Sequence, residues 1–348
     1  MTNFGINGFG RIGRTAFRIW WLKHRDKIDL KVINTSGSMD IGNWVHLIKY
    51  DSNYGPFEEK IEFQEYQKAK QVTDENSVIG KIIIQNRNII VTAQRNPKLI
   101  PWEQNKVDVV IESTGVFIDE EKAKLHLDGG AKKVLISAPD KGGHIDMSVI
   151  SVNNFDKENY QIFSNASCTT NCVAPIMQVI MEKLGVEKAM LNTVHSYTDD
   201  QNLHDNSHKD LRRARSAAKN IVPTTTGAAK AVGRIIPELK GIFDGLAIRV
   251  PNNTGSISDL VIVTKKNTTI SEVNQILVEA SQEKRFHNIL AVSNEPLVSS
   301  DIIKRNESSI VDLELTNVVG GNLVRIVSWY DNEWGYCNRL IEQVIKLQ

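Results

Sequence analysis

Three glycines near the amino terminus constrain the fold of this chain more than any other feature. Gly8, Gly10 and Gly13 form the pattern G-x-G-x-x-G, which follows a strand-like run at residues 3–7 and opens an amphipathic helix at residues 14–23. In that context the glycines allow a tight turn and let backbone N–H groups approach a pyrophosphate at the helix N-terminus. A glycine-rich loop that only turns is the alternative, and the strand–helix context disfavours it. We therefore expect a dinucleotide-binding unit.

Strand and helix patterns alternate through the first half of the chain. Short β-rich runs at residues 30–34, 82–84 and 89–92 precede compact apolar runs at 107–112 and 134–137. Compact apolar runs of this kind are typical of strands buried in a parallel sheet. The alternation predicts an α/β fold with a Rossmann, doubly wound parallel sheet.

The pattern changes after the helix that follows residue 168. Longer alternating runs with few helices between them occupy residues 191–195, 246–250, 260–264, 310–315 and 323–329. They predict a second, α+β catalytic domain with a mixed or antiparallel sheet. Because the tail from 336 to 348 has a helical pattern with a partial apolar face, we expect it to pack back. The predicted domains are residues 1–166 with 332–348, and residues 167–331.

Composition limits the partners and the cellular compartment that can be expected for this chain. The 348-residue chain carries a net charge of +1, which gives no indication of nucleic acid or an anionic membrane as a partner. No apolar run approaches membrane-spanning length, and no signal-peptide pattern follows Met1. The three cysteines form no disulfide framework. These features predict a cytoplasmic protein without a membrane partner.

A cysteine between small hydroxyl residues stands just before a predicted helix. The sequence Ser167-Cys168-Thr169-Thr170-Asn171-Cys172 leads into an apolar periodic run at residues 173–184. Unpaired N–H groups and the helix dipole stabilise an anion at such a position. The Cys168 thiol should therefore ionise more easily than a free thiol and act as a nucleophile, and the same N–H groups could hold an oxyanion.

Three simpler interpretations compete with a nucleophile. A lone cysteine is most often buried and structural, and the neighbouring hydroxyls could serve only as helix N-caps. Cys168 and Cys172 could bind a metal, but they lack a second ligand pair, and Cys337 is distant in sequence, so no metal site is expected. His195 ends a predicted strand and is a candidate general base if it lies near Cys168. Sequence alone does not bring the two side chains together.

The second predicted strand ends without the usual acidic residue. A Rossmann site commonly has an Asp or Glu about 20 residues beyond the glycines to bind the ribose hydroxyls. Here the strand ends in Asn34-Thr35-Ser36-Gly37, with Asp29 too early and Asp40 somewhat late. Hydroxyls and amides at residues 35–37 would accept a ribose 2′-phosphate without charge repulsion. The alternative is that Asp40 folds back and takes the usual role.

These residues belong to a longer series of motifs. In chain order they are INGFGRIGR (6–14), HLIKYDSNYG (46–55), ESTGVF (112–117), SNASCTTNC (164–172), HSYTDDQ (195–201), HKDLRRAR (208–215), TTTGAAKAVG (224–233), RVP (249–251) and SWYDNEWGY (328–336). With them the chain resembles the phosphorylating glyceraldehyde-3-phosphate dehydrogenases essentially from end to end. The cysteine and carboxyl-terminal motifs are highly specific.

The resemblance implies a covalent mechanism. Cys168 would attack the aldehyde of D-glyceraldehyde 3-phosphate, and His195 would help ionise the thiol, stabilise the thiohemiacetal and act as base. Hydride would pass to NAD or NADP, and inorganic phosphate would release 1,3-bisphosphoglycerate from the thioester, reversibly. The resemblance also implies a homotetramer in which the segment from about 198 to 222 reaches a neighbouring cofactor site.

The resemblance further assigns binding residues. Around the substrate C3 phosphate it places Thr198, Asp200 and Arg249, and around the attacking phosphate Ser167, Thr169, Thr226 and Gly227, with Arg213 nearby. For the cofactor it implies Gly8, Gly10, Arg11, Ile12, Gly13, Asn34, Thr35, Ser36, Arg95, Ser113, Thr114, Gly115, Phe117, Ser207, Asn332 and Tyr336. Hydroxyl, amide and guanidinium donors all suit phosphate oxygens.

Two departures from strict NAD-using members concern the cofactor. Thr35 replaces the ribose-binding Asp, and Asn206-Ser207 replaces a Leu-Pro pair, as in NADP-using relatives. We therefore expect NADP to be used at least as well as NAD. The stretch 143–147 also deviates, without a functional meaning that we can assign.

Two alternatives to this activity stay open. An erythrose-4-phosphate dehydrogenase would share the Cys and His but release the acyl group to water, although residues 224–230 resemble the triose enzymes more closely. A nucleotide-binding redox sensor without turnover is disfavoured by the intact set of Cys168, His195, Arg249 and Asn332.

Overall fold

The computed structural model describes residues 1–140 and 142–348, which form two compact units. The first unit comprises Met1–Ser148, Phe155–Asn165 and Cys337–Gln348, and the second comprises Val149–Asn154 and Ala166–Tyr336. Residues 332–336, which the sequence analysis placed with the first domain, belong here to the second unit.

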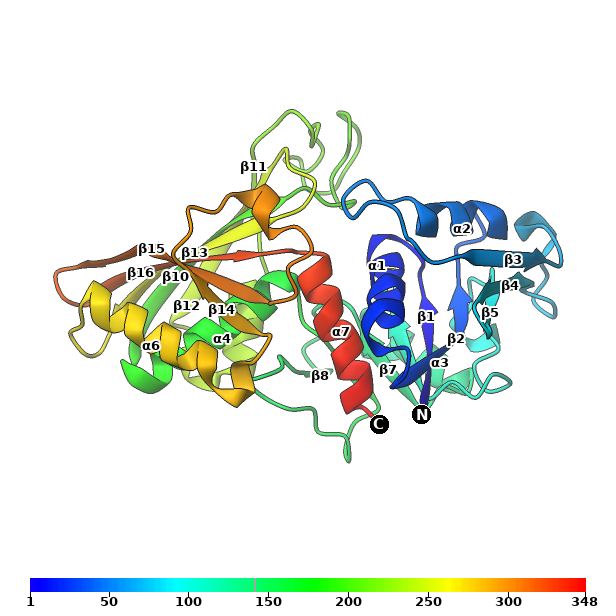
Figure 1. Ribbon diagram of the computed structural model, residues 1–348, viewed down its shortest axis with the longest axis horizontal. Helices are drawn as coiled ribbons and strands as arrows, with labels where there is room; N and C mark the ends of the chain where they lie inside the picture. The colour runs from blue at the N-terminus through cyan, green and yellow to red at the C-terminus, as the bar shows by residue number, and fades with distance from the viewer. Residues whose placement is uncertain (141) are drawn as a thin grey trace. The chain divides into compact units, whose positions relative to one another are not determined.

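A nine-stranded sheet organises the first unit. Its strands are β1 (Thr2–Asn7), β2 (Ile28–Asn34), β3 (Ile61–Glu65), β4 (Val78–Ile84), β5 (Arg87–Thr92), β6 (Val109–Glu112), β7 (Lys133–Ile136), β8 (Asp146–Met147) and β9 (Ile162–Ser164). They lie in the order β3-β4-β5-β2-β1-β6-β7-β9-β8 (Figure 1). The pairs β3–β4 and β4–β5 are antiparallel, and all other neighbours are parallel. The predicted doubly wound sheet is confirmed.

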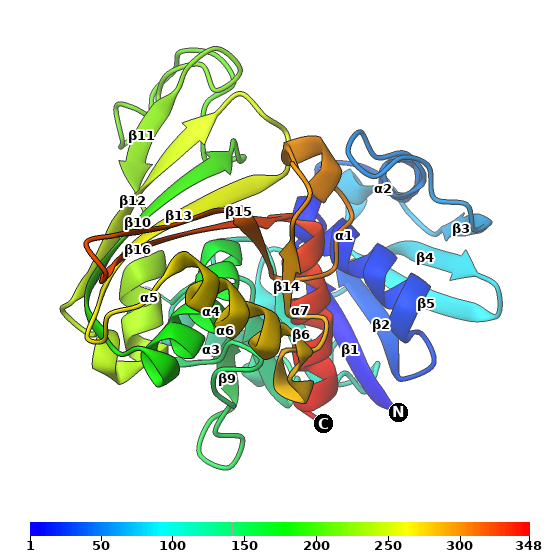
Figure 2. The ribbon, with the colours of Figure 1, turned by 60° about the vertical axis from the view of Figure 1, so that its left-hand side comes forward.

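The first helix begins earlier than its apolar pattern indicates. The helices of this unit are α1 (Arg11–Ile19), α2 (Ile41–Lys49), α3 (Glu120–Asp128) and, from Cys337 onward, α7 (Trp334–Lys346). Gly10, in extended conformation, is the N-cap of α1, so the helix starts directly after the glycine turn. After Ile19 it continues as a π-helical turn, Trp20–His24. Helices α1 and α7 lie side by side in both views (Figures 1 and 2).

The core of the first unit is aromatic on one side of β1. Phe4, Phe17 and Trp20 are fully buried, and their rings meet edge to face. These contacts explain why the apolar stripe of α1 faces the sheet, since burying each aromatic side chain removes a large apolar area from water.

The second unit is built on a seven-stranded mixed sheet. Its strands are β10 (Val186–Ser196), β11 (Val222–Thr225), β12 (Phe243–Val250), β13 (Ser256–Thr264), β14 (Leu290–Ser293), β15 (Ser309–Val319) and β16 (Leu323–Tyr330). They lie in the order β11-β12-β10-β13-β16-β15-β14. Only β10–β12 and β14–β15 are parallel among the described pairs. The predicted mixed sheet is confirmed.

Three helices cover one face of this sheet (Figure 2). They are α4 (Cys168–Lys183), α5 (Ala228–Ile235) and α6 (Ile270–Gln282), of which only α4 was predicted. Short 3-10 turns complete the chain at Ala69–Gln71, Pro97–Leu99, Pro237–Leu239, Lys284–Phe286 and Ser299–Ile302. Among the described residues, no helix combines the length and apolar character needed to cross a membrane.

Candidate active site

Cys168 is the first residue of α4. Ser167 caps the helix, because its Oγ accepts a hydrogen bond of 3.0 Å from the Thr170 N–H. The hydroxyls of Ser167 and Thr170 also lie 2.7 Å apart. The predicted position of Cys168 at a helix N-terminus is confirmed, and its side chain is partly exposed there.

The structure brings Cys168 and His195 together, which the sequence left open. The Sγ atom of Cys168 lies 3.3 Å from Nε2 of His195, a residue near the carboxyl end of β10. His195 is buried, with only 4% of its surface exposed. A thiol and an imidazole in hydrogen-bond contact form the geometry that nucleophilic catalysis by cysteine requires.

The other ring nitrogen of His195 has two competing partners. Nδ1 lies 2.7 Å from the Ser196 carbonyl oxygen and 2.5 Å from Nη1 of Arg249, its cross-strand neighbour on β12. One nitrogen cannot both donate to Ser196 and accept from Arg249. If Nδ1 donates, the lone pair of Nε2 faces the thiol; if it accepts, Nε2–H faces the sulfur. The contact with Arg249 therefore influences which ring nitrogen of His195 carries the proton.

Burial sets the ionisation of this pair in the free protein. Burial, and after it the charge of Arg249, lower the pKa of His195 to about 3. Burial also raises the pKa of the Cys168 thiol, which the charge of Arg249 and hydrogen bonds with Thr169 oppose without reversing. The expectation that this thiol ionises more easily than a free one is thus wrong for the unliganded chain, because desolvation outweighs the helix terminus. The resting pair is a neutral thiol beside a neutral imidazole.

Tyr330 contacts the site through both its hydroxyl and its ring, although no role was predicted for it from the sequence. Its hydroxyl lies 2.9 Å from the hydroxyls of both Thr169 and Thr193. Its ring meets that of His195 edge to face at 5.9 Å. Tyr330 is buried, and burial raises the pKa of its hydroxyl, so it remains protonated and joins α4, β10 and β16. Its place in the motif 328–336 was the available signal.

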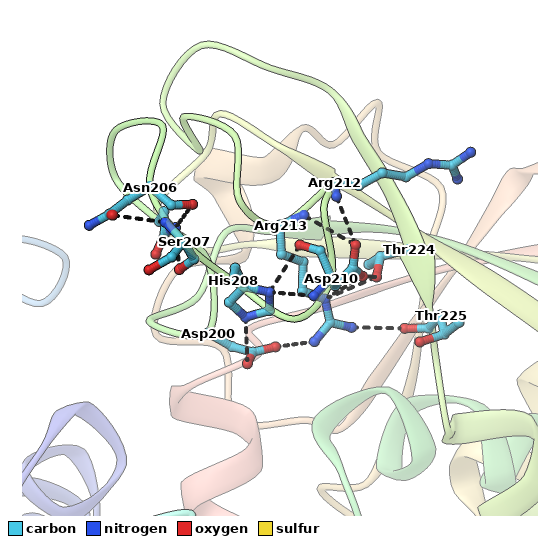
Figure 3. Close-up of polar contacts among 10 residues, drawn as sticks. Asp200, Asn206, Ser207, His208, Asp210, Arg212, Arg213, Thr224 and Thr225 are labelled. Carbon is cyan, nitrogen blue, oxygen red and sulfur yellow. Dashed lines mark hydrogen bonds and ion pairs between the residues drawn. The ribbon is translucent and has the colours of Figure 1, made fainter.

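Guanidinium groups mark two candidate anion sites. Arg249 has its Nε atom buried without a hydrogen-bond partner among the described residues, which is the state expected of a donor that waits for an anion. Arg213 donates from Nε to Thr224 Oγ1 at 2.9 Å and from Nη2 to the Thr225 carbonyl at 3.3 Å, and its Nη1 pairs with Asp200 (Figure 3). Asp200 and Arg213, which the resemblance assigns to different phosphates, contact each other here.

The remaining phosphate residues border helix termini or the same loop. Thr226 Oγ1 accepts from the Ala228 N–H at 3.2 Å, and Gly227 is the N-cap of α5, with open space where a side chain would stand. Thr198 is half-buried and lies two residues beyond the end of β10. Ser207 is exposed in the loop between β10 and β11, and its N–H donates to Asn206 Oδ1 at 2.8 Å (Figure 3).

Two further predicted cofactor residues in this unit are fixed by backbone contacts. Asn332 Oδ1 accepts from the Gly255 N–H at 3.1 Å and from the Ser256 hydroxyl at 2.9 Å. Tyr336 donates its hydroxyl to the Ala166 carbonyl at 3.1 Å. The first set of contacts fixes the orientation of the Asn332 amide, with its oxygen turned toward the protein.

In the first unit, Gly8 and Gly13 let backbone segments approach each other closely, and Gly10 leaves open space, or a cradle, at the start of α1. Gly8 has φ +93°, and a Cβ there would lie 2.7 Å from the Thr114 nitrogen. A Cβ on Gly13 would lie 2.2 Å from the Gly8 carbonyl oxygen. Gly10 brings no capping side chain to the start of α1, whose first N–H groups have no partner within the helix. Such a cradle fits the pyrophosphate of a dinucleotide.

Neighbouring residues shape the same edge of the sheet. Arg11 opens α1 and pairs with Asp51 at 2.6 Å, while the Ile12 carbonyl accepts from the Cys337 thiol at 3.6 Å. After β6, Ser113 donates its hydroxyl to the Gly8 carbonyl at 2.8 Å, and Thr114 and Gly115 are exposed. Phe117 packs edge to face on His126.

A cavity of about 360 Å³ lies beyond the end of β2. It is lined by Ser36, Gly37, Ala69, Val72, Thr73, Asp74, Ala93, Gln94 and Arg95. The sequence analysis expected the Thr35 hydroxyl to be available there. Instead Thr35 is buried and donates its hydroxyl to the Thr92 carbonyl at 3.0 Å, so only Ser36 and the backbone of Gly37 line the cavity from this loop.

Asp40 is engaged elsewhere. Its Oδ1 accepts from the Ala69 N–H at 2.8 Å, and its Oδ2 lies 3.4 Å from Lys68 Nζ. The Ala69 hydrogen bond, followed by Lys68, lowers the pKa of this carboxyl. The geometry thus does not favour the alternative in which Asp40 folds back to a ribose. Within residues 1–140 and 142–348, no cluster of three or more potential metal ligands is found.

Comparison with known proteins covers both units. Residues 2–120 match the family described as glyceraldehyde 3-phosphate dehydrogenase, NAD binding domain, and residues 167–332 match the C-terminal domain of the same enzyme. The chain is 48% identical over 344 residues to a glyceraldehyde-3-phosphate dehydrogenase of Thermotoga maritima, covering 98% of each chain. It is 45% identical to glyceraldehyde-3-phosphate dehydrogenase 2 of Synechocystis sp., over 98% of this chain and 97% of the relative. It is also 45% identical to the chloroplastic glyceraldehyde-3-phosphate dehydrogenase A of Chlamydomonas reinhardtii, over 97% and 86%.

Proposed function

The chain belongs to the glyceraldehyde-3-phosphate dehydrogenase family, and on that premise we propose that it catalyses the reversible, phosphorylating oxidation of D-glyceraldehyde 3-phosphate to 1,3-bisphosphoglycerate. The observation that carries the proposal is the 3.3 Å contact between Cys168 Sγ, at the start of a 16-residue helix, and His195 Nε2. A nucleophile, a base and a helix N-terminus meet at one point.

The first step joins Cys168 to the substrate. As Sγ forms a bond to the aldehyde carbon, the thiol proton passes to Nε2 of His195 and the carbonyl π electrons move onto oxygen. The N-terminus of α4 stabilises the resulting oxyanion. His195 is neutral in the free protein, and its Nε2 is able to take this proton when Nδ1 donates to the Ser196 carbonyl.

Oxidation and release follow at the same sulfur. A nicotinamide dinucleotide, when bound, supplies the acceptor of the hydride and its two electrons. His195 first returns the thiol proton to the oxyanion, which gives the thiohemiacetal hydroxyl; it takes that proton back as the hydride leaves, and the thiohemiacetal becomes a thioester. An oxygen of inorganic phosphate then attacks the acyl carbon, and the C–S bond breaks with the electron pair returning to Cys168.

We assign the two phosphates to the two guanidinium groups. Arg249, with its buried and unpartnered Nε, receives the C3 phosphate of the substrate together with Thr198. Arg213, oriented by Asp200 and Thr224, serves the attacking phosphate with Thr226 and Gly227. Bidentate recognition of phosphate by Arg supports both assignments.

We further propose that NADP is used at least as well as NAD. The β2–α2 loop brings no carboxylate to the cavity, because position 35 is a threonine and Asp40 binds Ala69 and Lys68. Arg95 lines the same cavity as a cation, and Asp74 lines it as an anion whose Oδ1 accepts from Gln94. This balance of charges supports dual use rather than strict specificity.

A homotetramer is proposed from the family and from one sheet face. On the side of the second sheet opposite α4, α5 and α6, apolar side chains are exposed at Met190, Leu246, Val261 and Leu323. Exposed apolar patches of this kind mark interaction surfaces.

A steady-state assay with both cofactors, with and without inorganic phosphate, tests the activity. Turnover of glyceraldehyde 3-phosphate should depend on phosphate. Phosphate-independent turnover of erythrose 4-phosphate would instead favour the erythrose-4-phosphate dehydrogenase. Absence of turnover with both substrates, together with slow alkylation of Cys168, would favour a non-catalytic sensor.

A further inference from the structure

Four polar residues form one row across the first sheet. Thr92, Asn34, Asn7 and Glu112 are the last residues of β5, β2, β1 and β6, which are adjacent parallel strands, and they are partners in register. All four are buried, none with more than 3% of its surface exposed.

Their side chains are hydrogen-bonded in series. Thr92 Oγ1 donates to Asn34 Oδ1 at 2.7 Å, and Asn34 Nδ2 donates to Asn7 Oδ1 at 2.7 Å. Asn7 Nδ2 donates in turn to Glu112 Oε2 at 2.5 Å. Every bond runs in the same direction and the series ends on a carboxylate, an arrangement in which each bond polarises the next. We call these four residues the polar ladder.

The ladder is not what packing alone requires. The preceding row on the same face of these strands is Ile90, Val32, Gly5 and Val110, which carries no polar side chain; Val32 and Val110 are fully buried in an apolar cluster against which Ile90 packs. A polar row in that environment costs desolvation free energy that an apolar row would not. A fully connected buried network fixes the relative positions of the strand ends that carry it, because each donor has a specific acceptor.

Each member of the ladder directly precedes a loop at the carboxyl edge of the sheet. Asn7 precedes Gly8, and Glu112 precedes the loop at 113–115. The ends of the ladder hold these loops: Glu112 Oε1 accepts from the N–H and the hydroxyl of Thr114, at 2.7 and 2.5 Å. At the other end, Asn34 exchanges two bonds with the backbone of Gln94, at 2.8 and 2.9 Å.

These contacts leave Asn34 no capacity for a ligand through its side chain. Its two N–H bonds go to Asn7 and Gln94, and its oxygen accepts from Thr92 and Gln94. His126 supports the opposite end, with Nε2 at 3.0 Å from Glu112 Oε2, and is itself fully buried.

We propose that the polar ladder is a positioning device that fixes the spacing of the dinucleotide-binding loops, without touching the dinucleotide. Glu112 sets the loop of Thr114 against the glycine turn, and Asn34 sets the loops that line the cavity beyond β2. The inference rests on the proposed function only in taking a nicotinamide dinucleotide as the ligand of this edge.

The two ends of the ladder should be separable by fragment binding. In Glu112→Gln, one carboxylate oxygen becomes an N–H₂ group that meets an N–H donor whichever way the amide turns. We expect this variant to bind NADPH about tenfold more weakly while its affinity for adenosine monophosphate changes less than twofold. Thr92→Val acts at the adenosine end and should weaken both ligands alike, by about threefold.

Titration calorimetry in a Cys168→Ser background measures these affinities without turnover. Ser164→Ala is the matched control, because Ser164 ends β9, two strands from β6 in the same sheet, and its buried hydroxyl donates to the Ala138 carbonyl. If Glu112→Gln melts at a lower temperature but binds NADPH like the control, the ladder is only structural and the proposal fails. Equal weakening of both ligands in Glu112→Gln would contradict it as well. If the affinities of the ladder variants change as expected but the protein with Cys168 intact shows no turnover, only the proposed function would be contradicted.

Discussion

At the scale of single residues, two cysteines one helical turn apart differ only in their surroundings. Cys168 is partly exposed at the first position of α4. Cys172 is fully buried, donates to Ser328 Oγ at 3.6 Å, and has its pKa raised by burial to about 12. A thiol that neither ionises nor meets solvent does not react, which supports Cys168, and not Cys172, as the proposed nucleophile.

We expect Cys168→Ser to abolish dehydrogenase activity and to leave fold and cofactor binding intact. A hydroxyl at this position has far too high a pKa to supply the attacking anion. Cys172→Ser is the matched control and should retain activity. Steady-state rates within tenfold of the parent for Cys168→Ser would contradict the assignment.

His195→Asn should slow turnover and reduce alkylation of Cys168 by iodoacetamide near neutral pH. General-base catalysis contributes about 10²–10⁴-fold, so a loss in that range is expected. In the parent, alkylation should rise with pH beyond the ordinary thiol value of 9.0, because the pKa of Cys168 is raised. A pH profile of alkylation that is identical in parent and variant would show that the two side chains do not interact.

His195 also predicts a pH dependence of stability. Its pKa falls from 6.5 to about 3 on folding, so the unfolded chain binds a proton that the folded chain refuses. The stability of the folded chain that depends on a neutral His195 is fully present above pH 6.5, and it is lost as the pH falls from 6.5 toward 3. Urea unfolding at pH 7 and pH 4.5 should show a smaller loss of stability in His195→Asn than in the parent. The exposed His287→Asn should behave like the parent; an unchanged loss in His195→Asn would contradict the buried neutral imidazole.

At the scale of elements, α6 shows a start signal that the sequence analysis did not use. Thr269 is its N-cap and accepts from the Glu272 N–H at 3.2 Å, within the pattern T-x-x-E. Thr269→Ala should lower the free energy of unfolding by about 1 kcal/mol, measured by urea denaturation. Ser271→Ala, exposed and one residue inside the helix, is the control. No difference between the two variants would show that the cap contributes nothing.

Local patterns predicted some elements and not others. The start of α4 and the strands β1, β2 and β10 follow from periodicity and caps, because these signals lie within a few residues of each other. The π-helical turn at Trp20–His24 has no such signal, since it depends on packing of Trp20 and Trp21. The polar ladder was equally out of reach, because its members come from four strands and meet only through register.

The candidate site divides in the same way. Motifs predicted that Cys168, His195 and Arg249 are catalytic or substrate-binding residues. Their contacts with each other, however, depend on the pairing of β10 with β12 and on the placement of α4. The pKa of Cys168 was predicted in the wrong direction, because burial is a property of the folded chain and not of the motif.

At the scale of the whole molecule, the proposed cofactor preference rests on two departures from the NAD-using pattern, Thr35 and Ser207. Thr35→Asp with Ser207→Pro should shift preference toward NAD by at least about tenfold, or 1.4 kcal/mol of differential binding. A carboxylate at position 35 has no proton to donate to the Thr92 carbonyl, as Thr35 does, so it would turn toward the cavity, where it would bind ribose hydroxyls and repel a 2′-phosphate. Proline at position 207 would remove a donor. The single variants are the controls, and kcat/KM with each cofactor is the measurement. A hundredfold NAD preference in the unmodified protein would contradict this interpretation.

The contact of Arg249 with His195 has a consequence for how the enzyme recognises a complete substrate. While the guanidinium occupies Nδ1, that nitrogen must accept, and the proton sits on Nε2, where it blocks transfer from the thiol. A phosphate that draws Arg249 away frees Nδ1 to donate to Ser196, and the base turns toward sulfur. If the proposed function is correct, binding of the substrate phosphate is thus required before the thiol proton can be transferred at the other end of the substrate. Glyceraldehyde without its phosphate should lose kcat as well as affinity, by at least about tenfold at saturation.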